Sequence, residues 1–188
     1  MGALEMNLQE DELLHLVQRW RNVNINIKNF WYNVGNAALE TVSKQKPMRV
    51  GKITFEYYDN YLFIKLPSGR KLSYFNPMLK RNIYGKESLT YEGIATNKKW
   101  QRIETYGPKL VENIVQGISR DILAHAMMNL KRRNFKIVMH VHDEVVLEVK
   151  KNQVTVEEIC EIITIPPPYA EDLCLKAEAY KCDFYKKE

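Results

Sequence analysis

The chain contains the segment Lys136-Ile-Val-Met-His-Val-His142-Asp143-Glu144-Val-Val-Leu-Glu-Val149, in which two adjacent acidic residues separate two apolar runs. Both runs are rich in β-branched residues, which favour strands. With only Asp143-Glu144 between them, the runs predict a tight β-hairpin that carries both acids in its turn. Carboxylates on such a rigid support can bind a divalent cation, and oxygen ligands of this kind suit Mg²⁺.

Length, composition and charge set broad limits. The 188 residues suffice for one domain with a core, or for two small lobes. The net charge of +5 permits a nucleic-acid partner, although many other proteins are as basic. No apolar stretch approaches the ~20 residues that span a bilayer, and the acidic N-terminus does not resemble a secretory signal, so no membrane partner is expected. The three cysteines fit no zinc motif, which predicts reduced thiols in a cytoplasmic protein.

The first part of the chain combines helices with a small β element. Apolar residues from Leu13 to Trp20 recur at helical spacing, and a second helix is predicted over 25–42. Alternation over 50–57 and 62–66, on either side of Asp59-Asn60, predicts a hairpin. A short strand over 71–74 is expected to stop at Asn76-Pro77. Residues 81–106 show no period, so we expect them to be irregular and largely exposed.

The second part centres on the acidic hairpin. A long amphipathic helix is predicted over 109–133, directly before it, with one apolar stripe: Val111, Ile114, Val115, Ile118, Ile122, Ala126, Met127 and Leu130. After the hairpin, Thr155 and Glu158 have capping-box spacing, which predicts a short helix to about residue 163. An alternating strand over 175–180 is expected to join the sheet of the hairpin. These patterns divide the chain into residues 1–108, a helical and β-hairpin region, and residues 109–188, the core with the candidate catalytic hairpin.

Several motifs occur together at characteristic distances. His142-Asp143-Glu144 lies between apolar strands, and Val115-Gln116-Gly117 followed by Arg120-Asp121-Ile-Leu and Ala126-Met127 stands upstream of it. This combination resembles the C-terminal palm portion of family A DNA polymerases, the DNA polymerase I type. Leu66-Pro-Ser-Gly-Arg70 and Leu110-Val-Glu-Asn-Ile-Val-Gln116 are similar to phage members of that family, and Met1-Gly-Ala-Leu resembles the sequence that follows its fingers helix. The resemblance implies an α+β fold of the palm type, an antiparallel sheet with helices packed on one face, plus N-terminal helices and a small β-hairpin element.

The resemblance also implies roles for individual residues in DNA-directed DNA synthesis. Two Mg²⁺ ions about 4 Å apart activate the primer hydroxyl and stabilise the leaving pyrophosphate. Asp143 would be the shared metal ligand, and Glu144 a second catalytic acid that supports it. His142 would contact the primer end, and Gln116 would approach the minor groove, where every base pair offers an acceptor.

Three further residues are expected to bind DNA. Arg70 belongs to the family's Gly-Arg segment. The family usually has an Asn four residues before the helical Gln and an Arg four residues before that Asn. Here Asn113 is three residues before Gln116, and Lys109 is four before Asn113, so the sequence departs from the pattern at both positions.

Parts of a complete polymerase are not found in this sequence. The family needs an earlier strand with a second catalytic Asp, and a fingers helix that binds the deoxynucleoside triphosphate. We therefore expect the chain to be inactive alone, with primer-template DNA, deoxynucleoside triphosphates and an upstream polymerase segment or separate chain as partners. An alternative is a non-catalytic DNA-binding or complementing subunit of a split or decayed polymerase.

A different class of function remains open on the residues alone. His140 and His142 are two apart, which would place them on one face of a strand. Together with Asp143 or Glu144 they could hold a transition metal for hydrolysis. Replacing His140 would separate this hypothesis from the polymerase hypothesis, which gives His140 no metal role.

Overall fold

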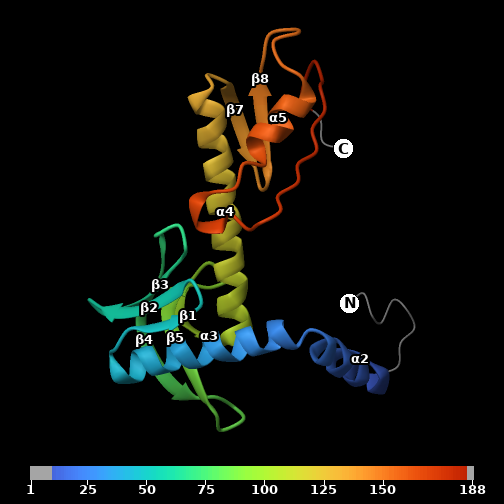
Figure 1. The fold of residues 1–188 in the computed structure, drawn as a ribbon. Coiled ribbons are helices and arrows are strands. Elements are labelled where there is room, and N and C mark those ends of the chain that lie inside the picture. Colours follow the sequence, from blue (N-terminus) through green and yellow to red (C-terminus); the bar gives the residue numbers. More distant parts are fainter. Residues whose placement is uncertain (1–9, 186–188) are drawn as a thin grey trace. The chain divides into compact units, whose positions relative to one another are not determined.

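The computed structural model describes residues 10–185, and Figure 1 shows its helices and strands. The motif Met1-Gly-Ala-Leu lies outside the described residues. The chain forms two compact units. The first contains the residues up to Ile64 together with Leu72–Asn113, and the second contains Lys65–Lys71 together with the residues from Ile114 onward. The mixture of helices with antiparallel strands confirms the α+β class.

Two helices open the first unit, as the apolar spacing predicted. They are α2 (Glu10–Val23) and α3 (Ile25–Lys44), and Trp20 of α2 stacks on Trp31 of α3 with ring centroids 5.7 Å apart. Gln45 ends α3 in the left-handed conformation, at φ 51°. None of the helices in residues 10–185 is long and apolar enough to cross a membrane.

A six-stranded sheet follows, in which each strand pairs with its neighbours in sequence. The predicted hairpin is confirmed by β2 and β3, which turn at Asp59 and Asn60, both at positive φ. The sequence predicted a β element of only two or three strands, a hairpin and a short strand, whereas the sheet has six strands. The strands are β1 (Met48–Val50), β2 (Ile53–Tyr58), β3 (Tyr61–Lys65), β4 (Lys71–Arg81), β5 (Glu87–Ile94) and β6 (Trp100–Thr105).

The expected stop at Asn76-Pro77 and the expected irregular region over 81–106 were both wrong. Strand β4 runs through Pro77 because the register shifts between Phe75 and Met78, and a bulge does not need the amide hydrogen that proline lacks. Strands β5 and β6 were not predicted from apolar periodicity because some of their buried side chains are polar. Ser88, Thr90 and Thr105 are buried there, and the Ser88 and Thr90 hydroxyls donate to Glu104 Oε1 and the Met78 carbonyl.

Helix α3 lies along one face of this sheet (Figure 1). Its buried positions are the small residues Val34, Ala37, Ala38 and Thr41, which allow a close approach to the sheet. Helix α4 (Gly107–Arg132) begins against α3. A Cβ atom at Gly107 would collide with the backbone carbonyl of Trp31, so only glycine permits this contact.

The second unit contains most of α4 and the predicted hairpin, formed by β7 (Lys136–Val141) and β8 (Glu144–Glu148). Helix α5 (Val156–Ile163) has the predicted capping box: the Glu158 amide donates to Thr155, and the Thr155 amide donates to the Glu158 carboxylate. A one-turn 3₁₀ helix, η1 (Pro168–Ala170), follows the prolines. Leu130, Val154 and Ile159 form the buried centre of this unit.

Two expectations for this unit need correction. The last strand over 175–180 does not form, and the sheet of the hairpin has two strands in the described part of the chain. Leu175 and Ala177 are half-buried, and the residues between and beside them are exposed. The alternating sequence pattern therefore indicated which side chains face the unit, but it did not indicate that the backbone pairs with another strand. Within the apolar stripe predicted on α4, Val115 is exposed.

We expect Gly107→Ala to destabilise the protein by about 2–3 kcal/mol, because the added methyl group must push the backbone of α3 away. Urea unfolding followed by circular dichroism measures the loss. Gly85→Ala is the control: the added carbon has open space around it, and only the positive φ of Gly85, +72°, which Gly107 does not share, opposes a side chain there, so it should cost only about 1 kcal/mol. Equal unfolding midpoints for the two variants would contradict the assigned contact.

Candidate functional site

The turn of the acidic hairpin differs by one residue from the prediction. Val141 pairs with Glu144, so the turn consists of His142 and Asp143, and Glu144 is the first residue of β8. A register shift between Ile137 and Met139 sets this two-residue turn. Without that extra residue, the Ile137–Leu147 register would pair His140 with Glu144 and leave three residues in the turn.

The turn holds His142 in an unusual backbone conformation. Its φ is +48°, the left-handed region that few residues other than glycine adopt, although histidine tolerates it better than most. His142 therefore leaves the face of the strand, and the expectation that it shares a face with His140 was wrong. Backbone strain of this kind is concentrated at functional sites, where surrounding structure maintains it.

The two acids have different surroundings. Both are exposed. The Asp143 carboxylate makes no hydrogen bond or ion pair with any other described residue, whereas the Glu144 carboxylate accepts a hydrogen bond of 3.3 Å from the Tyr185 hydroxyl. Burial, with a contribution from the nearby Glu144 charge, raises the pKa of Tyr185 above its usual value. Asp143 is thus the acid whose oxygens remain available to an incoming cation.

Arg120 links the helix to the hairpin. Its guanidinium lies against the His140 ring, with Nη1 3.4 Å from Nδ1 and Nη2 3.3 Å from Nε2. A guanidinium in that position opposes a second cation at His140 by charge repulsion. Within residues 10–185, no three His, Cys, Asp or Glu side chains are placed to hold a metal ion together. The transition-metal hypothesis therefore finds no support in this geometry.

Gln116 lies one helical turn before Arg120, and residues four apart share a face of a helix. The exposed Gln116 side chain is therefore on the same face of α4 as the residue that reaches β7. In Figure 1 the hairpin runs alongside α4 within this unit. The structure thus places the predicted minor-groove residue and the acidic turn on a common side of the second unit.

Arg70 is held against α4. Its Nε donates to Asp121 Oδ1 and its Nη2 donates to the Gly117 carbonyl, each at 2.7 Å. The Ser68 hydroxyl donates to the other Asp121 oxygen. Asp121 is only 11% exposed, whereas the Arg70 side chain is 45% exposed. Arg70 is consequently held against α4 at Gly117 and Asp121, with part of its guanidinium still accessible.

Sequence reasoning missed the residues that orient Arg70. Asp121 was part of a quoted motif but was given no role, and Ser68 was part of the Gly-Arg segment. Tyr169 is a third neighbour: burial raises its pKa, the Asp121 charge adds to the increase, and the Arg70 charge opposes it. The sequence signalled this site only through the turn residues Pro67-Ser68-Gly69. In the structure the Leu66 amide donates to the Arg70 carbonyl across that turn, at 2.8 Å.

Asn113 and Lys109 belong to the first unit, and their side chains bind other residues of that unit. The Asn113 amide donates to the Tyr74 hydroxyl at 2.9 Å, and burial raises the pKa of Tyr74 to about 12. Lys109 pairs with Glu112 at 2.8 Å, and this hydrogen bond raises the pKa of Lys109. The predicted DNA-binding role of these two residues remains a prediction. His125 of α4 is half-buried, with its Nε2 enclosed.

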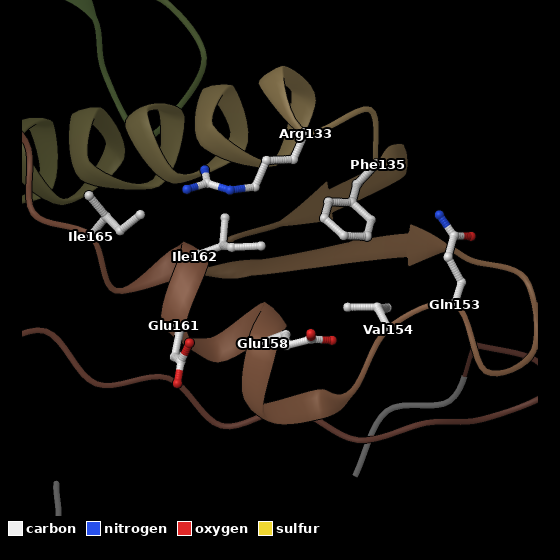
Figure 2. Close-up of a pocket in the computed structure, with 8 residues that line it drawn as sticks. All are labelled: Arg133, Phe135, Gln153, Val154, Glu158, Glu161, Ile162 and Ile165. Carbon is white, nitrogen blue, oxygen red and sulfur yellow. The ribbon is translucent and has the colours of Figure 1, made fainter.

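A pocket in the second unit is separate from these residues. Its volume is about 580 Å³, and Figure 2 shows Arg133 at the end of α4 and Ile162 of α5 pointing into the same space. None of the residues with a predicted catalytic or DNA-binding role lines it. The lining residues are Arg133, Phe135, Gln153, Val154, Glu158, Glu161, Ile162 and Ile165.

Comparison with known proteins supports a polymerase origin. The chain is 46% identical over 190 residues to a DNA polymerase of Bacillus phage SP02. The similarity covers the whole of this chain but only 29% of that protein, so the chain corresponds to a segment of a longer polypeptide. No protein-family model and no solved structure matches the chain.

We expect Asp121→Asn to weaken the attachment of the Leu66–Arg70 turn, because the cationic Arg70 then donates to an uncharged amide oxygen in place of a carboxylate. The expected loss is about 1–2 kcal/mol in free energy of unfolding, with faster hydrogen exchange at the Leu66 and Gly69 amides. Glu40→Gln, which changes the exposed pair with Lys44, is the control and should stay within about 0.5 kcal/mol of the parent. Unchanged exchange in Asp121→Asn would show that the Arg70 contact does not restrain the turn.

Proposed function

We propose that this chain is the palm portion of a family A DNA-directed DNA polymerase and takes part in template-directed nucleotidyl transfer. The observation that carries the proposal is the similarity of the entire chain to a segment of a DNA polymerase, combined with an accessible Asp143 at a two-residue turn. In this proposal the antiparallel hairpin β7–β8 is the catalytic part of the palm.

The donor set at the turn fits Mg²⁺ in kind but is incomplete. Carboxylate oxygens are the ligands that Mg²⁺ prefers, and Asp143 offers two without a competing protein partner among the described residues. Asp143 would hold both ions, and a second carboxylate from outside this chain would complete the site. When bound, the two ions would activate the primer hydroxyl and stabilise the leaving pyrophosphate.

The other residues would position DNA. In this proposal Glu144, held by Tyr185, supports the electrostatics of the turn, and His142 contacts the primer end. Gln116 and Arg70, both in the second unit, contact the duplex. These contacts would bring the primer terminus to Asp143, and proximity of this kind accounts for a large share of the rate of a transfer reaction.

A non-catalytic DNA-binding or complementing subunit is the alternative. It shares the similarity to a DNA polymerase, but it gives no reason for Asp143 to remain exposed and unpaired at a strained turn. The two functions differ in one measurable property, since only the polymerase proposal requires the Asp143 carboxylate for synthesis.

The test is a chimera in which this chain replaces the matched 190-residue segment of the SP02 polymerase. We expect Mg²⁺-dependent primer extension, and we expect Asp143→Asn in the chimera to lower it at least about 10³-fold, because a metal ligand contributes several kcal/mol of transition-state stabilisation. Asp172→Asn, which removes another exposed acid of the same unit, should leave extension within about twofold.

Circular dichroism of the variant chain is the folding control, since Asp143 makes no contact that folding requires. Full extension by a correctly folded Asp143→Asn chimera would remove Asp143 from the metal site. A chimera that binds primer-template DNA but extends no primer, with or without Asp143, would favour the non-catalytic subunit.

A further inference from the structure

Five aromatic rings form a continuous row across the six-stranded sheet of the first unit. The row runs from Tyr58 through Phe63, Tyr61 and Phe75 to Trp100, with successive ring centroids 4.4, 5.3, 5.0 and 6.1 Å apart. These residues come from strands β2, β3, β4 and β6. Cross-strand aromatic contacts stabilise a sheet. A row this long also gives one face of the sheet a continuous aromatic surface.

The row lies on the face of the sheet opposite the core. Leu62 and Ile64 alternate with Tyr61 and Phe63 along β3 and are completely buried. Because successive side chains of a strand point to opposite faces, the aromatic residues point away from that core. The two ends of the row are the most accessible, with Tyr58 42% and Trp100 58% exposed.

Trp100 is fixed in place although it is exposed. Its indole hydrogen-bonds to the Glu92 carboxylate. That carboxylate also accepts hydrogen bonds of 2.7 Å from Asn76 Nδ2 and from Arg102 Nη2. The Asn76 hydrogen bond is the largest of the influences that lower the pKa of Glu92, so the acceptor stays ionised at neutral pH. An exposed ring held in this way has already lost the rotamer freedom that binding would otherwise cost.

The surroundings of the row are basic. Residues 48–64 and 72–105, which form the sheet within this unit, contain eight Lys and Arg against five Asp and Glu, a net charge of +3 out of +5 for the whole chain. Lys98 and Lys99 immediately precede Trp100. The partner that complements this sheet is therefore flat, apolar on its faces and negatively charged along its length.

We propose that the exposed ends of the aromatic row, Tyr58 and Trp100, bind single-stranded DNA by stacking on its unpaired bases. Proteins that hold single strands combine aromatic rings, on which unpaired bases stack, with positive charge along the backbone path. Paired bases in a duplex do not expose these faces, so the surface would distinguish single strands from duplex DNA. The choice of DNA over RNA rests on the proposed polymerase function, whereas the stacking surface itself rests on the geometry of the sheet.

The experiment measures binding of the full chain to a fluorescein-labelled 20-nucleotide oligo(dT) and to a 20-base-pair duplex at equal salt. We expect Trp100→Ala and Tyr58→Ala each to weaken binding to the single strand about five- to 100-fold, and to change duplex binding less than twofold. Trp100→Phe should retain most of the affinity, because phenylalanine still offers a face for stacking.

Tyr84→Ala is the matched control. Tyr84 is 79% exposed in the turn between β4 and β5, outside the row, and its loss should leave single-strand binding unchanged. Equal weakening by Tyr84→Ala would indicate non-specific contact, and unchanged binding by the double variant Tyr58→Ala/Trp100→Ala would overturn the proposal and leave the row as packing surface for polypeptide. A chimera that extends no primer, made from a chain whose binding to the single strand still depends on Tyr58 and Trp100, would overturn the polymerase proposal alone, so the two failures are distinguishable.

Discussion

The close contact between α3 and the first turn of α4 is the constraint on which much of the first unit depends. Gly107 meets the Trp31 carbonyl at a distance that excludes any side chain, and Gly35 lies directly opposite. Because backbone meets backbone there, the position at which α4 begins is set by direct steric contact between the two helices and not by adaptable side chains. The same helix supplies Asn113 to Tyr74, so its start and its packing on the sheet are determined together.

In the second unit, the helix side of the candidate site is held firmly and the acidic turn is left open. Asp121 holds Arg70, and Arg120 contacts His140, so these side chains have partners within the unit. Asp143 has none among the described residues and stands at a turn where His142 is strained. A site that gains its function only when further ligands arrive would have this division, because a cationic side chain already paired with the carboxylate would compete with a metal ion for it.

Sequence patterns predicted elements best where burial depends on apolar side chains. The helices over 25–42 and 109–133, the hairpin around Asp59-Asn60 and the capping box at Thr155 follow local rules, and all four were confirmed. Strands β5 and β6 were missed because Ser88, Thr90 and Thr105 are buried as hydroxyl residues, which an apolar pattern does not register. Strand 175–180 was predicted but does not form, because alternation of burial does not create a hydrogen-bonding neighbour.

The sequence by itself determined the α+β class, the long helix before the acidic hairpin, and the candidate residues around Asp143, because helical periodicity, strand alternation and turn preference are local properties. Only the tertiary structure decided which residues occupy the turn, since a bulge in β7 sets the pairing of Val141 with Glu144. It also decided that Arg70 is held by Asp121, and that aromatic residues from four strands form one row. These arrangements join residues distant in the chain, and the free energy that selects them comes from packing and hydrogen bonds that no local pattern contains.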